Sequence, residues 1–104
     1  MNDVHAGAFD VLRLPTWLAT KYLWWMSPTD ALRDPMRLIA QVMNLGTWDD
    51  VVALEAAVPR AALEDALRNA LPGWFSGPSW TLWHLRLGLA TPDSVPPLPR
   101  RTFE

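Results

Sequence analysis

Ser79 and His84 are the residues whose types come nearest to a catalytic pair in this sequence. A serine hydroxyl becomes a nucleophile when a base within hydrogen-bond reach takes its proton. The two residues lie five positions apart, which is about one and a half turns of a helix, so their side chains would meet only in an awkward geometry. We therefore interpret His84 as a packed or surface histidine, and the sequence predicts no nucleophilic catalysis.

The acidic residues that could act in acid–base chemistry come as two neighbouring pairs, Asp49 with Asp50 and Glu64 with Asp65. Sequence neighbours on a helix point about 100° apart, so neither pair converges as a general acid and base must. Asp49 and Asp50 are better explained as residues of a helix start, where acidic side chains complement the helix dipole. We expect that the chain is not an enzyme.

Residues that could bind a metal ion or a nucleotide show no recognised spacing either. The chain has two histidines, His5 and His84, and no cysteine, so the pattern offers no zinc-type ligand set. Residues 73–77 carry two glycines but have neither the lysine nor the preceding strand of a phosphate-binding loop. No metal site and no cofactor are expected.

Proline, glycine and capping residues divide the chain into short predicted helices. Asp34 before Pro35, and Thr47 before two acids, are N-terminal capping signals. Gly46 is expected to close one helix in the left-handed conformation, and Gly88 to cap the last one. The expected helices span 15–25, 35–45, 47–58, 59–71 and 78–87.

Length and composition indicate that these helices form a single domain. A chain of 104 residues with 50% apolar and 19% charged residues is typical of one globular domain. We predict an all-α fold of about five short helices, packed as a compact orthogonal bundle over residues 15–89. An irregular segment at 1–14 precedes it, and an extended proline-rich tail at 90–104 follows it.

Charge and hydropathy narrow the cellular context. The formal net charge of −2 gives no electrostatic footprint for a phosphate backbone. The absence of cysteine allows a reducing compartment. The first residues lack a signal-peptide pattern, and prolines and glycines interrupt the longest uncharged stretch, 69–85. Residues 17–26 carry one lysine and lack the basic face of a membrane-surface helix. We expect a cytoplasmic protein without membrane association.

The seven tryptophans are the outlying feature of the composition. Tryptophan is enriched at binding hot spots, so their number favours an interface, while a core built from large rings is the alternative. The last predicted helix is apolar around most of its circumference, which is typical of a central helix or of one covered by a partner. Its apolar residues are Trp80, Leu82, Trp83, Leu85 and Leu87.

Two weaker patterns point to other partners. Residues 47–71 could form a helix-turn-helix, but the reading helix would set Glu64 and Asp65 beside Arg60 and Arg68, and acids opposite phosphates are unfavourable. The tail sequence Pro-Pro-Leu-Pro-Arg-Arg at 96–101 fits a proline-rich ligand, a tail lying back over the domain, or an arm that wraps a partner.

The order of the motifs resembles a family of small bacterial proteins encoded beside nucleotidyltransferase-like toxins of the abortive-infection type. The resemblance covers about residues 15–90. It rests on the aromatic segment 22–25, the acids before the second helix, the segment 41–51, and the helix start at 74–84. The chain departs from the family at 56–59, where Ala-Ala-Val-Pro replaces a tyrosine and charged residues. The resemblance implies the antitoxin-like or accessory half of a two-gene module, acting through contact with its cognate toxin or through the operon.

Together these patterns predict a non-enzymatic protein–protein interaction module whose partner is a nucleotidyltransferase-type toxin. The alternatives are a DNA-binding autoregulator that uses residues 47–71 and a self-associating homo-oligomer. A protein partner or a second copy is favoured over nucleic acid, and no membrane association is expected. The residues expected to contact the partner are aromatic or basic and lie in the last helix, its approach and the tail: Trp74, Phe75, Trp80, Trp83, Arg100, Arg101 and Phe103.

Overall fold

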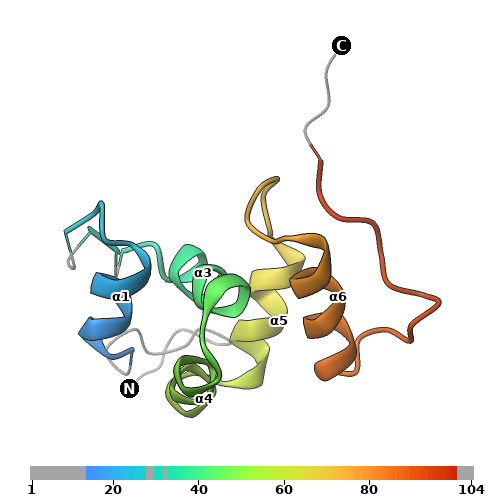
Figure 1. Cartoon of the computed structure of the whole chain (residues 1–104), viewed down its shortest axis with the longest axis horizontal. Helices are drawn as coiled ribbons and strands as arrows, with labels where there is room; N and C mark the ends of the chain where they lie inside the picture. Colours follow the sequence, from blue (N-terminus) through green and yellow to red (C-terminus); the bar gives the residue numbers. More distant parts are fainter. Residues whose placement is uncertain (1–13, 28–29, 32, 101–104) are drawn as a thin grey trace, which may run out of the picture.

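A computed structural model describes residues 14–27, 30–31 and 33–100, and all regular structure in these ranges is helical (Figure 1). The helices are α1 (Thr16–Tyr22), α3 (Pro35–Leu45), α4 (Trp48–Ala57), α5 (Arg60–Arg68) and α6 (Gly77–Arg86). The expected all-α class is therefore confirmed. The segment predicted to be irregular, 1–14, lies outside the described residues except for the buried Leu14.

Side-chain caps begin three of the helices. The Asp34 carboxylate accepts a hydrogen bond from the Arg37 N–H at 3.4 Å, and the Thr47 hydroxyl accepts one from the Asp50 N–H at 3.3 Å. Ser76 caps α6 in the same way through the Ser79 N–H. Each cap satisfies a backbone donor that has no partner within its helix. The two caps predicted from the sequence are thus confirmed.

Helix α3 lies at the centre of the bundle, where it contacts α1, α4, α5 and α6 (Figure 1). Its residues Leu38, Ile39 and Val42 are completely buried. Leu54 of α4 and Leu18 of α1 are completely buried as well and belong to the same apolar cluster. One core therefore holds all five helices together, and it fixes the relative positions of the surface side chains.

Two local predictions are wrong, for reasons that lie in the packing. Helix α1 ends at Tyr22 instead of Trp25, because the chain turns at the fully buried Leu23. Gly46 adopts φ −65° and ψ 144°, which is extended and not left-handed. A glycine is needed there because a Cβ would lie 2.4 Å from the Val42 carbonyl oxygen. Gly88 does adopt a left-handed φ of 68° after α6.

Residues 90–100 contain no helix or strand and lie beside α6. Val95 and Leu98 pack against the core, and the Pro96 carbonyl accepts a hydrogen bond from the Trp80 indole N–H at 2.8 Å. None of the described helices is long and apolar enough to cross a bilayer.

Candidate interaction surface

The aromatic residues that sequence reasoning assigned to a partner lie mostly in the interior. Trp83 is 1% exposed, and its indole N–H donates to the Met43 carbonyl at 2.8 Å. Phe75 and Trp80 are buried too, and Trp74 is half-buried against the same cluster. In this structure these rings serve the core, and the exposed aromatic side chains lie elsewhere. Of the predicted tail residues, Arg100 is exposed, whereas Arg101 and Phe103 lie outside the described residues.

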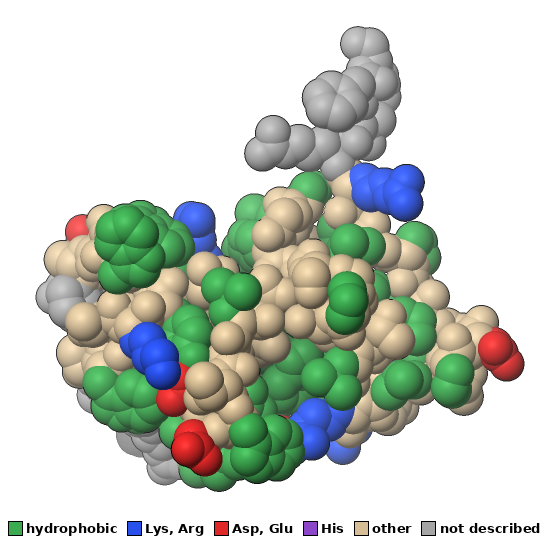
Figure 2. All heavy atoms as spheres, in the orientation of Figure 1, with side chains coloured by type: hydrophobic (Ala, Val, Ile, Leu, Met, Phe, Trp, Pro, Cys, Tyr) green, Lys and Arg blue, Asp and Glu red, His purple; other side chains and the backbone are tan. Residues whose placement is uncertain are grey.

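Four of the seven tryptophans expose about half of their surface or more, and they are Trp17, Trp24, Trp25 and Trp48. Figure 2 shows that hydrophobic side chains form several patches on one face, with charged side chains between them along its lower edge. Trp24 and Trp25 pack edge to face with ring centroids 5.8 Å apart, and Trp25 lies near the Arg37 guanidinium. Trp48 differs from these three because the arginine that contacts it, Arg86 of α6, is itself fixed by a carboxylate.

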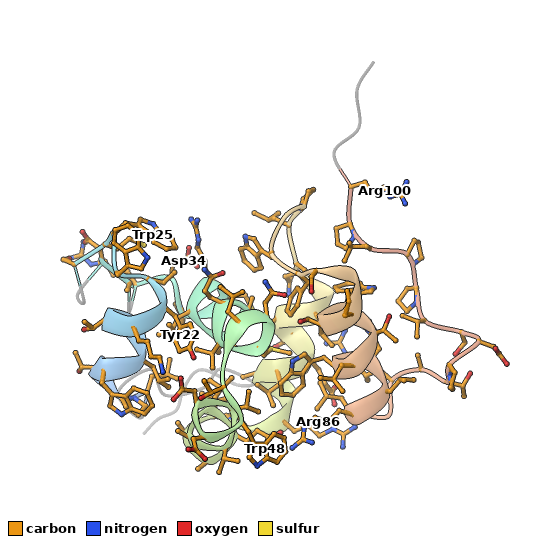
Figure 3. The ribbon with its side chains drawn as sticks, viewed as in Figure 1. Tyr22, Trp25, Asp34, Trp48, Arg86 and Arg100 are labelled. Carbon is orange, nitrogen blue, oxygen red and sulfur yellow. The ribbon has the colours of Figure 1, made fainter. Side chains whose placement is uncertain are left out.

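Trp48, Glu55 and Arg86 form a cluster between α4 and α6, called the Trp48 cluster below (Figure 3). The Arg86 guanidinium carbon lies 4.8 Å from the centre of the Trp48 ring and 5.7 Å from that of Trp83. Its Nε and Nη2 both donate to the Glu55 carboxylate at 3.0 Å. A bidentate pair holds the planar guanidinium in one orientation, and the guanidinium in turn stacks on the indole.

The electrostatics of the cluster keep Arg86 charged. Its hydrogen bonds to Glu55 raise the pKa of Arg86 above its usual value, although partial burial acts in the opposite direction. The Trp48 indole remains 63% exposed despite this contact. The cluster therefore presents a large exposed aromatic surface that an arginine–carboxylate pair holds in position.

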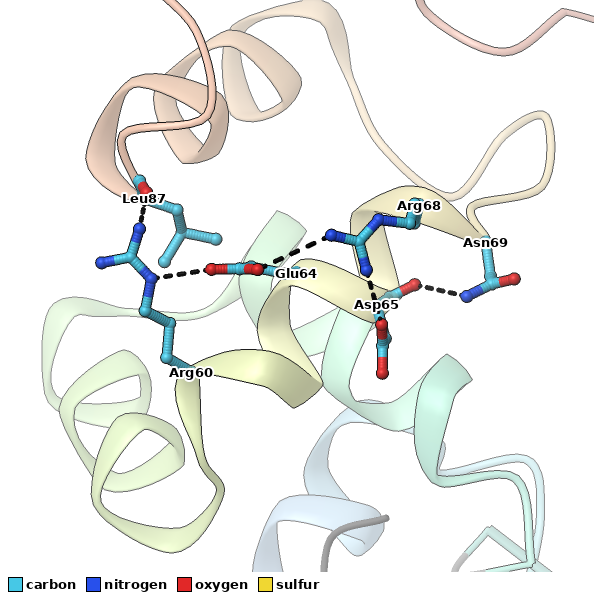
Figure 4. Close-up of polar contacts among 6 residues, drawn as sticks. All are labelled: Arg60, Glu64, Asp65, Arg68, Asn69 and Leu87. Carbon is cyan, nitrogen blue, oxygen red and sulfur yellow. Dashed lines mark hydrogen bonds and ion pairs between the residues drawn. The ribbon is translucent and has the colours of Figure 1, made fainter. Parts of the chain in front are cut away.

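A groove of about 350 Å³ adjoins the cluster and shares Glu55 and Arg86 with it. Its other lining residues are Val58, Arg60, Leu63 and Leu87. The Arg60 side chain donates to the Leu87 carbonyl and, at 2.7 Å, to Glu64 (Figure 4). Each arginine of the groove is thus paired with a carboxylate. The groove therefore combines three apolar side chains, which are largely buried, with charged side chains that are each paired with an opposite charge.

A second polar cluster anchors α4 against α1. The buried Asp50 carboxylate accepts hydrogen bonds from Lys21 Nζ at 2.6 Å and from the Tyr22 hydroxyl. The bonds from Lys21, and next those from Tyr22, hold the pKa of Asp50 below its usual value. Burial and then the bond to Asp50 raise the pKa of Tyr22, and the bond to Asp50 raises that of Lys21. Because Asp50 lies in the first turn of α4, this cluster also fixes the helix start that carries Trp48.

The residues considered for catalysis are engaged separately. The Ser79 hydroxyl donates to the Asn44 carbonyl at 3.1 Å, and His84 Nδ1 lies 2.7 Å from the Trp80 carbonyl. A carbonyl can only accept, so the His84 Nδ1 carries the proton. Within the described part of the chain, no three His, Asp or Glu side chains gather as a potential metal site.

Nothing in the sequence marked Trp48 as the exposed tryptophan of interest. Trp48 and Arg86 are 38 positions apart, and Glu55 lies between them. The one available hint was that Trp48 begins a helix whose next two residues are acids, a position that is commonly exposed. A search of family models, curated proteins and solved structures finds no match to this chain.

Proposed function

We propose that this chain is a non-enzymatic protein-binding module that engages its partner through the Trp48 cluster and the adjoining groove. The observation that carries the proposal is an exposed indole in contact with a guanidinium whose orientation a carboxylate fixes through two hydrogen bonds. Tryptophan and arginine are the residue types most enriched at binding hot spots. Because their positions are already fixed, these side chains lose less conformational entropy when a complex forms.

The partner that we propose is a nucleotidyltransferase-type toxin, so that the chain acts as an antitoxin-like or accessory protein. The support for this partner is the resemblance of the motifs at 22–25, 41–51 and 74–84 to proteins encoded beside such toxins. We propose further that the tail 90–104 is extended and contributes Arg100, Arg101 and Phe103 to the complex. The absence of cysteine agrees with a cytoplasmic setting.

DNA binding receives less support. Glu64 interacts with both Arg60 and Arg68, at 2.7 and 3.6 Å, and Asp65 binds Arg68 at 2.9 Å (Figure 4). Arginines paired within the helix are less able to neutralise phosphates, and the acids would face the same backbone. The helix that would read DNA therefore has no surplus of positive charge.

Co-expression with the product of the adjacent reading frame tests the proposal. The wild-type chain should co-purify with it, and Trp48→Ala should weaken the complex at least about tenfold, because hot-spot tryptophans dominate binding energy. Arg86→Lys should weaken it less, since the charge stays but the bidentate pair is lost. Trp25→Ala is the matched control, because this half-exposed indole lies on the other side of the bundle (Figure 3).

Two results would count against the proposal. One is a complex that Trp48→Ala leaves as tight as the wild type. The other is a chain that remains a monomer by sedimentation and ignores the neighbouring product. A symmetric dimer that Trp48→Ala dissociates would instead assign the same surface to self-association.

A further inference from the structure

A proline-rich segment of this chain is itself bound to the helices. The Trp80 indole N–H donates to the Pro96 carbonyl at 2.8 Å, across 16 positions of sequence. The flanking Val95 and Leu98 side chains are half-buried against the core. Residues 95–98 are called the strap below. Among the residues that the structure describes, one hydrogen bond and two apolar side chains hold the strap, which is few contacts for a permanent part of a fold.

The surface beneath the strap has the chemistry that recognises proline-rich chains. Phe75, Trp80 and His84 form a row of rings, with centroids 5.7 and 4.4 Å apart. Proline-rich segments have no internal hydrogen bonds, so their carbonyls are free to accept a hydrogen bond from the protein that binds them. Aromatic grooves bind such segments because the chain is already extended and loses little entropy. Trp80 provides both the flat ring and the donor.

The strap leaves part of this surface open. A groove of about 360 Å³ lies between α5 and α6, and Pro96 forms one of its walls. Leu67, Trp80, His84 and Leu89 line it, with Glu64 and Arg68 of α5. His84 is only 6% exposed, and its Nδ1 is hydrogen-bonded to the Trp80 carbonyl within α6. Its other ring nitrogen has no hydrogen-bond partner among the described residues, so it is available to a ligand in the groove.

We propose that Trp80 and the adjoining α5/α6 groove together bind a proline-rich segment of a partner protein, and that the strap covers the Trp80 part of this site in the partner's absence as an intramolecular competitor. The strap shows which chemistry the groove accepts, because it seats a carbonyl of a Pro-Pro sequence on the Trp80 donor. This site is separate from the Trp48 cluster and does not depend on it. It lies on the other flank of α6.

Competition by the strap sets the behaviour of the site. A tethered ligand acts at an effective concentration that reaches the millimolar range, so a free ligand sees only the fraction of molecules whose strap is open. Weakening the strap raises the apparent affinity for an added peptide by the factor by which the open fraction rises. A site without a competing strap would show no such gain.

The experiment titrates a fluorescein-labelled peptide, Ser-Val-Pro-Pro-Leu-Pro-Arg, the sequence of residues 94–100, into the full-length chain. The double variant Val95→Ser/Leu98→Ser should bind this probe about tenfold more tightly than the wild type. Leu82→Ser is the matched control, because it changes an exposed leucine of α6 and should leave the affinity unchanged. Equal affinities of wild type and double variant would overturn the proposal.

Two further comparisons identify the contact. Trp80→Phe, made in the double variant and checked for helical circular dichroism, should weaken binding about fivefold through the lost N–H donor. A probe whose prolines are replaced by glycine should bind at least about tenfold more weakly, and this control leaves the protein unchanged. A probe that binds equally well without its prolines would refute recognition of proline. A wild-type dimer that the double variant abolishes would assign the groove to the strap of a second copy and overturn the intramolecular assignment.

Discussion

Trp83 is the largest side chain that the bundle buries completely, and Trp83→Phe tests how the core is held. Its indole N–H donates to the Met43 carbonyl at 2.8 Å. Met43 lies in the last turn of α3, where carbonyls have no partner within the helix. The indole therefore links two helices and satisfies a buried acceptor, and phenylalanine can do neither.

The size of the effect follows from two losses. Leaving the Met43 carbonyl without a partner lowers the free energy of unfolding by about 1–3 kcal/mol. The smaller ring leaves a void in a core that relaxes only partly, which lowers it by about 1 kcal/mol more. We expect a total loss of about 2–4 kcal/mol, a large share of the roughly 5–15 kcal/mol typical of a domain.

Urea unfolding followed by far-ultraviolet circular dichroism measures this loss as a lower midpoint at an unchanged slope. Trp24→Phe is the control, because Trp24 is 75% exposed and its replacement should stay within about 0.5 kcal/mol of the wild type. A Trp83→Phe variant as stable as the control would refute the assignment of Trp83 to the core. If that variant also lost partner binding, the interface role expected from the sequence would be restored.

Two more substitutions test the anchoring of α4 and the junction before it. The lowered pKa of Asp50 means that its bonds stabilise the fold above the usual carboxyl value of 3.8, and that this stability is lost as the pH falls through the lower folded value. Unfolding midpoints measured between pH 2.5 and 6 should therefore fall more steeply on acidification for the wild type than for Asp50→Asn. The control Asp49→Asn changes an exposed neighbour and should follow the wild type. Equal slopes for the wild type and Asp50→Asn would contradict the assignment. Gly46→Ala should lower the free energy of unfolding by about 1–3 kcal/mol, because the added Cβ meets the Val42 carbonyl. Gly77→Ala is its control in the same urea titration, since a Cβ there meets nothing within 4 Å, and a Gly46→Ala variant as stable as this control would show that the junction has room.

The helices were predictable to the extent that their signals are local. Asp34 with Pro35 and Thr47 mark helix starts through bonds to residues three positions away, so neighbouring sequence suffices to recognise them. The end of α1 was not predictable in this way. Leu23 leaves the helix because the core takes its side chain, and helical periodicity alone cannot distinguish that from one further turn.

The candidate site was harder to predict because the fate of each tryptophan depends on distant residues. The buried position of Trp83 depends on the Met43 carbonyl, 40 positions away in α3. The contact of Trp48 with Arg86 spans 38 positions. Composition indicated an unusual number of tryptophans, and four of them expose about half of their surface or more. It gave no information on which four these would be.

Helix α6 connects the two proposed surfaces, and its spacing explains how one short helix serves both. Successive residues turn by about 100°, so Trp80 and His84 lie about 40° apart, while Arg86 lies about 160° from His84. Trp83 and Leu87 lie between these flanks and face the core. The His84 flank borders the α5 groove, and the Arg86 flank borders α4. Because both flanks depend on the same buried ridge, a core substitution such as Trp83→Phe should disturb both surfaces together. Trp48→Ala and Trp80→Phe should each affect only one.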